Sequence, residues 1–260
     1  MAKSPVRVSR TGRFTTITMD RPERRNALSL AHIEALIDAF READASDASG
    51  IVLAGNGPVF SSGHDFADMA GADHASVRHL LTVCAELMAA VQATRQPVIA
   101  KVHGLATAAG CQLVCTADLA VASDTAGFAI PGGKGGWYCH TPLVAVARAI
   151  GRKRALEMAM TGDTIDADRA LHWGMVNRVV APEDLDAATI ELLERATRGS
   201  FASKALGKAG FYAQVDLDQP KAYAYATELM AAASQIPDGQ EGMHAFIEKR
   251  KPDFDPPTGR

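Results

Sequence analysis

The chain has 260 residues, of which 47% are hydrophobic and 22% charged, so it can bury one substantial core. Its formal net charge of −3 argues against a nucleic-acid partner, because such a partner calls for a basic face. The N-terminus lacks the apolar run of a secretory signal. The sequence also contains no run of about eighteen apolar residues, which a membrane span would require. These features predict a soluble, cytoplasmic protein with no membrane partner.

Short apolar runs alternate with helical periodicity along the chain. Strands are predicted at residues 14–19, 51–54, 98–102, 119–122 and 175–180, and helices at 30–45, 77–93 and 141–161. Asp166 starts a further helix that Gly174 ends, and Pro182 opens another. The alternation predicts an α/β fold of stacked ββα units with buried parallel strands. Because the pattern is nearly all helical after residue 183, we expect a core over residues 1–195 and a C-terminal helical region over 196–260.

Four cysteines stand at positions 84, 111, 115 and 139, without the paired spacing of a metal site or the density of a disulfide scaffold. Cys111 and Cys115 share a predicted helix face and could hold a metal together with a histidine. Free cysteine packs as a small hydrophobic residue, however, so the pattern favours reduced core thiols. We therefore expect no metal site.

Two segments of small residues each indicate a strand that enters a tight turn just before a helix. Residues 60–69 are FSSGHDFADM, and residues 98–113 are VIAKVHGLATAAGCQL. Such turns leave backbone N–H groups free to point at a ligand. If the two turns face each other, they make an oxyanion hole.

Together the two turns resemble the paired signature of the crotonase superfamily, the enoyl-CoA hydratases and isomerases. Three further segments match the family in order: residues 21–29 resemble its adenine-side loop, residues 155–180 its helix and strand after the active site, and residues 241–254 its C-terminal helix. The resemblance covers nearly the whole chain. It implies a crotonase-type spiral of ββα units with a C-terminal helical trimerisation region, and a homotrimer or dimer of trimers. It also implies an acyl-CoA thioester as the ligand, with coenzyme A as part of the substrate and no separate cofactor.

The resemblance assigns the oxyanion donors to the backbone N–H groups of His64 and Ala109. Preorganised donors of this kind stabilise the charge that a thioester oxygen gathers in the transition state. The resemblance also implies contacts with CoA or the acyl group for residues in the adenine-side loop, the two turns and the C-terminal helix. These residues are Arg25, Ala27, His64, Asp65, Phe66, Ala67, Ala109, Phe246 and Lys249.

The two catalytic glutamates of the family's hydratases correspond here to Gln112 and Gly132. Gln112 can hydrogen-bond a water or a carbonyl but cannot take a proton near neutral pH, and Gly132 has no side chain. Each general acid or base is worth about 10²–10⁴-fold in rate, so hydratase activity is expected to be heavily reduced. In this respect the chain resembles the subgroup of enoyl-CoA hydratase domain-containing proteins.

His140 lies at the spacing where crotonase relatives that dehalogenate aryl-CoA thioesters or shift dienoyl-CoA double bonds have an aspartate. A histidine serves as an acid or a base near neutral pH, so His140 is the candidate for the remaining proton transfer. The alternative is a histidine that caps or packs at the helix start beside Thr141.

Three functions stay open. The first is an acyl-CoA thioester-binding enzyme of the enoyl-CoA hydratase/isomerase type, in fatty-acid or related acyl-CoA metabolism. The second is another crotonase chemistry, isomerisation or thioester hydrolysis, that uses His140. The third is a catalytically silent acyl-CoA-binding or interaction protein. The feature that discriminates among these three functions is the absence of both catalytic carboxylates. Their absence weakens hydration but leaves thioester binding unaffected.

Overall fold

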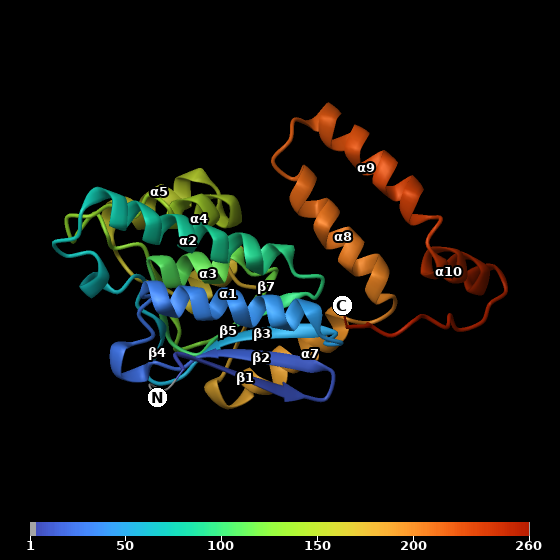
Figure 1. Ribbon diagram of the computed structural model, residues 1–260, viewed down its shortest axis with the longest axis horizontal. Helices are drawn as coiled ribbons and strands as arrows, with labels where there is room; N and C mark the ends of the chain where they lie inside the picture. Colours follow the sequence, from blue (N-terminus) through green and yellow to red (C-terminus); the bar gives the residue numbers. More distant parts are fainter. Residues whose placement is uncertain (1–3, 260) are drawn as a thin grey trace.

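A six-stranded sheet and a smaller four-stranded sheet form the centre of the fold in the computed structural model, which describes residues 4–259 (Figure 1). The larger sheet has the order β1 (Val6–Thr11), β2 (Phe14–Met19), β3 (Gly50–Gly55), β5 (Val98–Val102), β7 (Leu119–Ser123) and β10 (Arg178–Val180). β1 and β2 pair antiparallel, and the other neighbours in this sheet pair parallel. The smaller sheet has the order β4 (Val59–Ser61), β6 (Leu105–Thr107), β8 (Gly127–Ala129) and β9 (Ile165–Asp166).

Three successive ββα units each contribute one strand to the larger sheet and one to the smaller sheet. In each unit the first strand, β3, β5 or β7, joins the larger sheet and the second strand, β4, β6 or β8, joins the smaller one. A helix follows each pair: α2 (His74–Ala93), α3 (Ala109–Thr116) and α4 (Pro142–Ile150). The predicted ββα repetition is therefore present, and the turn between each second strand and its helix lies at the same end of the fold.

The long apolar runs explain why these strands occupy the interior. All residues of β3 except its last are buried, as expected for a parallel strand covered on both faces. α1 (Leu30–Ala45) packs beside α2 and buries the face that includes Ile33, Leu36 and Phe40. Ser29 caps α1, since its side chain accepts a hydrogen bond from the His32 N–H at 3.3 Å.

The helix predicted over residues 141–161 is two helices in the structure, α4 and α5 (Arg152–Thr161). Gly151 separates them with a φ of +81°, a conformation that interrupts a helix and favours glycine. α6 (Ala167–Trp173) follows the prediction: Asp166 caps its start, and Gly174 ends it in the left-handed conformation. The strand predicted from residue 175 begins only at Arg178.

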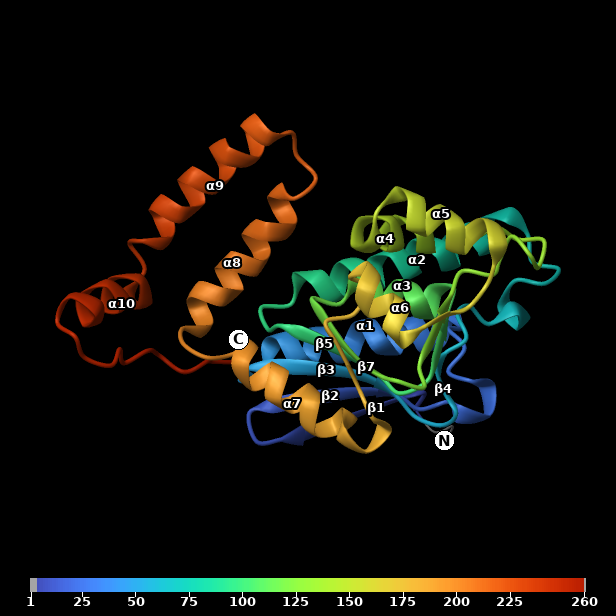
Figure 2. The ribbon, with the colours of Figure 1, turned by 180° about the vertical axis from the view of Figure 1, so that it is seen from behind.

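The C-terminal helices project away from the sheets, as both views show (Figures 1 and 2). α7 (Leu185–Ala196) still packs on the larger sheet, where Leu185 and Leu193 join a second apolar cluster. Beyond it come α8 (Phe201–Gln214), α9 (Gln219–Ala233) and α10 (Pro237–Ile247). The expected boundary at residues 195 and 196 falls at the end of α7, and an independent C-terminal unit stays a prediction.

Apolar side chains lie exposed on the projecting helices. Tyr223 is 67% exposed, Met230 80% and Phe246 84%. Large exposed apolar side chains grouped on one region mark an interaction surface. Among the described residues, no helix combines the length and the apolar character needed to cross a membrane.

Candidate functional site

The two predicted turns lie against each other. Gly63 has a φ of +84°, and a Cβ placed on it would lie 2.9 Å from the Ala108 Cβ and 3.2 Å from the Ala109 backbone nitrogen. A Cβ on Gly110 would lie 2.5 Å from the Ser61 carbonyl oxygen. The backbones of the two turns therefore approach each other so closely that only glycine fits at both positions.

Both predicted donor groups lack a backbone acceptor in the described part of the chain. Ala109 is the first residue of α3, so its N–H has no acceptor within the helix. The hydrogen bonds that flank His64 join Leu28 to Gly63 at 2.8 Å and Asp65 to Leu28 at 3.1 Å, and they leave the His64 N–H unused. Two free N–H groups on touching turns are the geometry that an oxyanion site requires.

Ala108 holds the second turn in an unusual conformation. Its φ of +49° and ψ of −118° lie in a region that costs a residue with a side chain of order 1–3 kcal/mol. Its N–H donates to the Ala129 carbonyl at 3.0 Å, which fixes the turn to β8. The strain is concentrated where α3 presents its first N–H groups.

A cavity of about 460 Å³ opens beside the turns. Its wall includes the first turn, the second turn and the loop of residues 131–142. The aromatic rings of this wall are in contact: Trp137 meets His64 edge-on at 6.3 Å and Phe66 at 6.2 Å between ring centroids, and Tyr138 lies 5.1 Å from His140. A cavity of this size and lining suits an apolar acyl group.

Asn26 ties the predicted adenine-side loop to the first turn, and sequence reasoning missed it. Its buried side-chain amide donates to the carbonyls of Asn56, Val59 and Phe60 at 2.8, 3.1 and 3.0 Å, and its Oδ1 accepts from the Arg21 N–H at 3.0 Å. Its φ of +51° is a conformation in which asparagine is enriched, which is the only local signal of its role.

Asp65 makes its hydrogen bonds and ion pairs within the protein. Its carboxylate accepts from Arg24 at 3.0 Å and from the Ala67 N–H at 3.2 Å, and it lies 3.5 Å from Arg21. Burial opposes the ionised form, but these hydrogen bonds and the arginine charges outweigh it and lower the pKa of Asp65. Asp65 thus positions the loop relative to the turn, while its contact with a ligand stays a prediction.

The other predicted residues of the adenine-side loop and the first turn lie close by. The Arg25 carbonyl accepts from the Ser62 N–H at 3.0 Å, and the Ala27 carbonyl accepts from the Arg21 side chain at 3.1 Å. Phe66 is 65% exposed at the cavity mouth. The structure therefore brings this part of the predicted set together.

Gln112 and Gly132, which stand at the positions of the family's two glutamates, have different surroundings in the structure. Gln112 is buried on α3, its Oε1 has no hydrogen-bond partner in the described residues, and it does not line the cavity there. Gly132 lines the cavity, but a Cβ on it would overlap the Trp137 carbonyl oxygen and lie 2.6 Å from the Cys139 Sγ. The loop is closed too tightly at Gly132 for any side chain, glutamate included.

The two candidate histidines occupy opposite environments. His140 is exposed at the rim, where its N–H donates to the Tyr138 carbonyl at 2.9 Å. His64 is 8% exposed, and neither of its ring nitrogens makes a hydrogen bond of normal geometry in the described residues. Burial lowers the pKa of His64, and the nearby Leu28 backbone opposes this in part.

Phe246 and Lys249 do not join this site within one chain. Both lie in or just after α10, at the opposite end of the molecule from β4 and its turn in both views (Figures 1 and 2). Phe246 instead lines a separate cavity with Met243 and Phe254. A contact of these residues with CoA stays a prediction.

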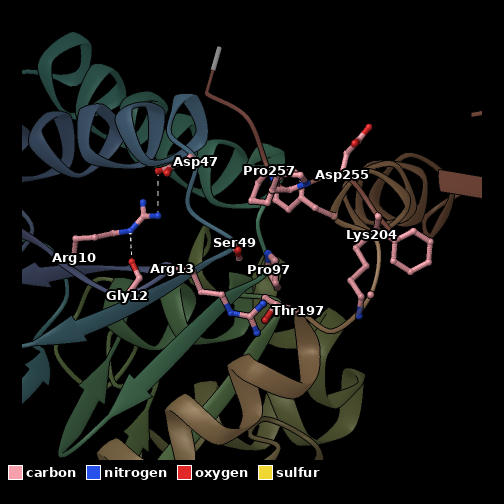
Figure 3. Close-up of a pocket in the computed structure, with 14 residues that line it drawn as sticks. Arg10, Gly12, Arg13, Asp47, Ser49, Pro97, Thr197, Lys204, Asp255 and Pro257 are labelled. Carbon is pink, nitrogen blue, oxygen red and sulfur yellow. Dashed lines mark hydrogen bonds and ion pairs between the residues drawn. The ribbon is translucent and has the colours of Figure 1, made fainter. Parts of the chain in front are cut away.

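A second cavity, of about 500 Å³, lies between the β1–β2 hairpin and the C-terminal segment (Figure 3). Arg10 there pairs with Asp47 at 3.0 Å and donates to the Gly12 carbonyl at 2.8 Å, while Arg13 lies over the Phe14 ring. Lys204 donates to the Ala196 carbonyl at 2.7 Å. None of the predicted site residues lines this cavity.

The four cysteines are free: Cys84, Cys111 and Cys139 are buried, and Cys115 is partly buried. Burial raises the pKa of Cys84 to about 12. Within residues 4–259 no group of three histidine, cysteine, aspartate or glutamate side chains is placed to hold a metal ion.

Residues 10–257 match the family model described as enoyl-CoA hydratase/isomerase, and the chain belongs to this family, whose enzymes act on acyl-CoA thioesters. The chain is 45% identical over 241 residues to enoyl-CoA hydratase domain-containing protein 3, mitochondrial, of Mus musculus, which is 91% of this chain and 79% of the relative. The solved structure of an enoyl-CoA hydratase from Mycobacterium smegmatis has a TM-score of 0.93 and 42% identity, covering 96% of this chain and 99% of that one. The structure of human enoyl-CoA hydratase domain-containing protein 3 has a TM-score of 0.91 and 39% identity, with coverage of 96% and 99%.

These comparisons confirm the predicted crotonase superfamily, the resemblance to the domain-containing subgroup and the crotonase-type α/β fold. They contradict the expected cytoplasmic location, because the Mus musculus relative and its Homo sapiens counterpart, 44% identical to this chain, are described as mitochondrial. Composition could not reveal this, since overall composition and net charge are compatible with either compartment.

Proposed function

We propose that the chain is an acyl-CoA thioester-binding enzyme of the enoyl-CoA hydratase/isomerase type that stabilises a thioester enolate. The backbone N–H groups of His64 and Ala109 would hold the thioester oxygen, and the adjoining cavity would hold the acyl chain. Removal of one such donor typically costs about 2.7–4 kcal/mol of barrier. Coenzyme A enters as part of the substrate, with no separate cofactor, in fatty-acid or related acyl-CoA metabolism.

The contact between the turns supports the proposal most strongly. A Cβ on Gly63 would come within 3.2 Å of the Ala109 nitrogen, so the two free donors are held close together without any side chain between them. Two donors fixed before the substrate binds need no reorganisation during the reaction.

The positions of the missing glutamates favour an alternative within the same family. Gln112 cannot take a proton, and Gly132 has no room for a carboxylate, so water addition by two carboxylates is not supported. Isomerisation or thioester hydrolysis with a histidine, His140 being the candidate from the sequence, needs only the oxyanion site and one proton-transfer group. A silent acyl-CoA binder needs the oxyanion site alone.

The proposed assembly is a homotrimer or a dimer of trimers. The exposed apolar side chains of α9 and α10 would be covered by neighbouring copies. Phe246 and Lys249, which lie far from the turns of their own chain, would then reach CoA only in a neighbouring copy. No nucleic-acid or membrane partner is proposed.

Calorimetric titration tests the binding function. Hexanoyl-CoA should bind more tightly than hexanoic acid, because the nucleotide and the oxyanion contacts supply most of the affinity. Equal affinity for the free acid would refute the proposal. A turnover screen over short, long and aromatic acyl-CoA thioesters then separates an enzyme from a silent binder.

A further inference from the structure

The large apolar side chains of the cavity beside the paired turns are mostly aromatic. Phe66, Trp137 and Tyr138 line this cavity. Among the described residues that line it, Leu81 is the only leucine, isoleucine, valine or methionine. An alkyl chain gains from any apolar wall, whereas an aromatic ring gains an additional stabilisation from other rings, beyond the area that it buries. The lining therefore favours a ring in the ligand over an open chain.

Two of these rings have open surface. Phe66 is 65% exposed and Trp137 is 42% exposed. They belong to different segments, the short helix η2 (Phe66–Asp68) and the loop of residues 131–142, and their rings meet edge-on at 6.2 Å with 77° between the ring planes. Large apolar side chains that lie exposed side by side on a cavity wall mark a place for an apolar ligand group.

Both rings stand close to the proposed oxyanion donors. Phe66 follows His64, whose backbone N–H is one donor, by two residues. The Trp137 ring packs against the buried His64 ring, with 6.3 Å between centroids and 61° between the planes. Ala108, which directly precedes the other donor residue, lines the same cavity. The acyl atoms nearest to a thioester held by these donors therefore meet aromatic side chains first.

We propose that the acyl group of the ligand is an arylacetyl group, which is a flat aromatic ring joined to the thioester carbonyl through one CH2. This inference rests on the proposed function, because it needs the thioester oxygen on the two backbone N–H groups. The aryl ring lies against Trp137 and Phe66 in the edge-to-face or offset-stacked arrangement that aromatic rings prefer. The CH2 carries α-protons, so the group is compatible with an enolate.

The size of the cavity does not make this choice. A volume of about 460 Å³ has room for an aromatic or a saturated six-membered ring. The two rings differ in what the wall can recognise: the aromatic ring has a negative face and a positive edge, and the saturated ring has neither. Selection for the aryl group should therefore depend on the Phe66 and Trp137 rings.

Calorimetry with phenylacetyl-CoA and cyclohexylacetyl-CoA tests the inference, because the two thioesters share one carbon skeleton and differ only in the saturation of the ring. The wild type should bind phenylacetyl-CoA at least about threefold more tightly, which is within the contribution of one aromatic pair. Phe66→Leu and Trp137→Leu keep an apolar side chain and should each lower this ratio, and the double substitution should bring it close to one. Phe211→Leu, the same change at a 53% exposed phenylalanine of α8, is the matched control for Phe66→Leu and should keep the wild-type ratio.

The outcomes separate the two proposals. Wild-type protein that binds neither thioester more tightly than the corresponding free acid overturns the proposed function. Tight binding of both thioesters with a ratio near one, or a ratio that survives the double substitution, overturns the arylacetyl assignment alone.

A spectroscopic measurement keeps the assignment testable if the double variant does not fold. In the wild type, phenylacetyl-CoA should shift the ¹H resonances of the Trp137 ring through its ring current, and cyclohexylacetyl-CoA should not. Trp173, buried on α6, is the internal control and should keep its resonances with both thioesters. Equal Trp137 shifts with the two thioesters would overturn the assignment.

Discussion

Replacement of Gly110 by alanine should loosen the contact between the two turns. Gly110 is the second residue of α3, and a Cβ there would lie 2.5 Å from the Ser61 carbonyl oxygen and 2.8 Å from the Ser61 Cβ. Ser61 cannot move aside freely, because it is fully buried and its hydroxyl donates to the Asn26 carbonyl at 2.9 Å. The added methyl group must therefore displace the backbone of one turn.

Two opposing effects decide the sign of the change in stability. Alanine is better than glycine in a helix by about 0.8–1.0 kcal/mol, which would stabilise the variant. Overpacking a tight interior contact typically costs about 1–3 kcal/mol. The cost here should lie at the upper end of that range, because the atom that the new methyl group meets belongs to the Ser61 backbone. We expect Gly110→Ala to lower the free energy of unfolding by about 1–2 kcal/mol and to weaken hexanoyl-CoA binding.

Urea unfolding of Gly110→Ala and Gly207→Ala, with hexanoyl-CoA calorimetry, provides the assay. Gly207 is also inside a helix, α8, but a Cβ there meets no atom within 4 Å, so its replacement should stabilise the protein by the helix-propensity gain alone. A Gly110→Ala variant as stable as Gly207→Ala, with unchanged affinity, would refute the close contact between the turns.

Three other substitutions test the supports of the site and of the C-terminal helices. Asn26→Ala should lower the free energy of unfolding by about 3 kcal/mol or more, because three carbonyls and one N–H lose their buried partner at about 1–3 kcal/mol each. Asp65→Asn should be less stable than the wild type at pH 7. Because the folded-state pKa of Asp65 is lowered, its ionised form adds stability above the unfolded value of about 3.9, and acid titration through the folded pKa should abolish the difference. Lys208→Met breaks a partly buried pair with Asp118, 2.7 Å apart, and should cost about 1–3 kcal/mol because the remaining polar group loses its partner.

Each of these substitutions has its own contradicting result. Wild-type stability in urea of Asn26→Ala, or of Asn26→Asp, which keeps the shape but cannot donate, would show that the three carbonyls do not need the amide. For Asp65→Asn, a stability difference that does not shrink as the pH falls below the unfolded-state pKa would remove the charge from the explanation. Lys208→Met with wild-type stability would mean that α8 is held in place by other contacts.

The sequence predicted the elements whose signals are local. The helix over residues 30–45 has the predicted bounds, because one stripe of apolar residues and a capping serine define it. The strand at 98–102 also has the predicted bounds, since its apolar run is continuous. The strands β6, β8 and β9 were not predicted, because each has only two or three residues and exists through its pairing with a distant neighbour.

At the site, backbone features were easier to anticipate than side-chain partners. Small residues at 63 and 108–110 indicate tight turns wherever they lie, and the structure places those turns in contact. The ion pairs of Asp65 join segments far apart in sequence, so no local pattern reveals them. The distance between Phe246 and the turns follows from the projection of the C-terminal helices, which is a property of the whole fold. The tight closure at Gly132 likewise comes from the path of the following loop.

A crystal structure of the protein with hexanoyl-CoA tests the central claim most directly. The account predicts the thioester oxygen about 2.7–3.1 Å from both the His64 and the Ala109 backbone nitrogens, with the hexanoyl chain in the cavity beside Trp137. A thioester oxygen that contacts neither nitrogen, or a ligand seated instead in the cavity of Figure 3, would contradict it.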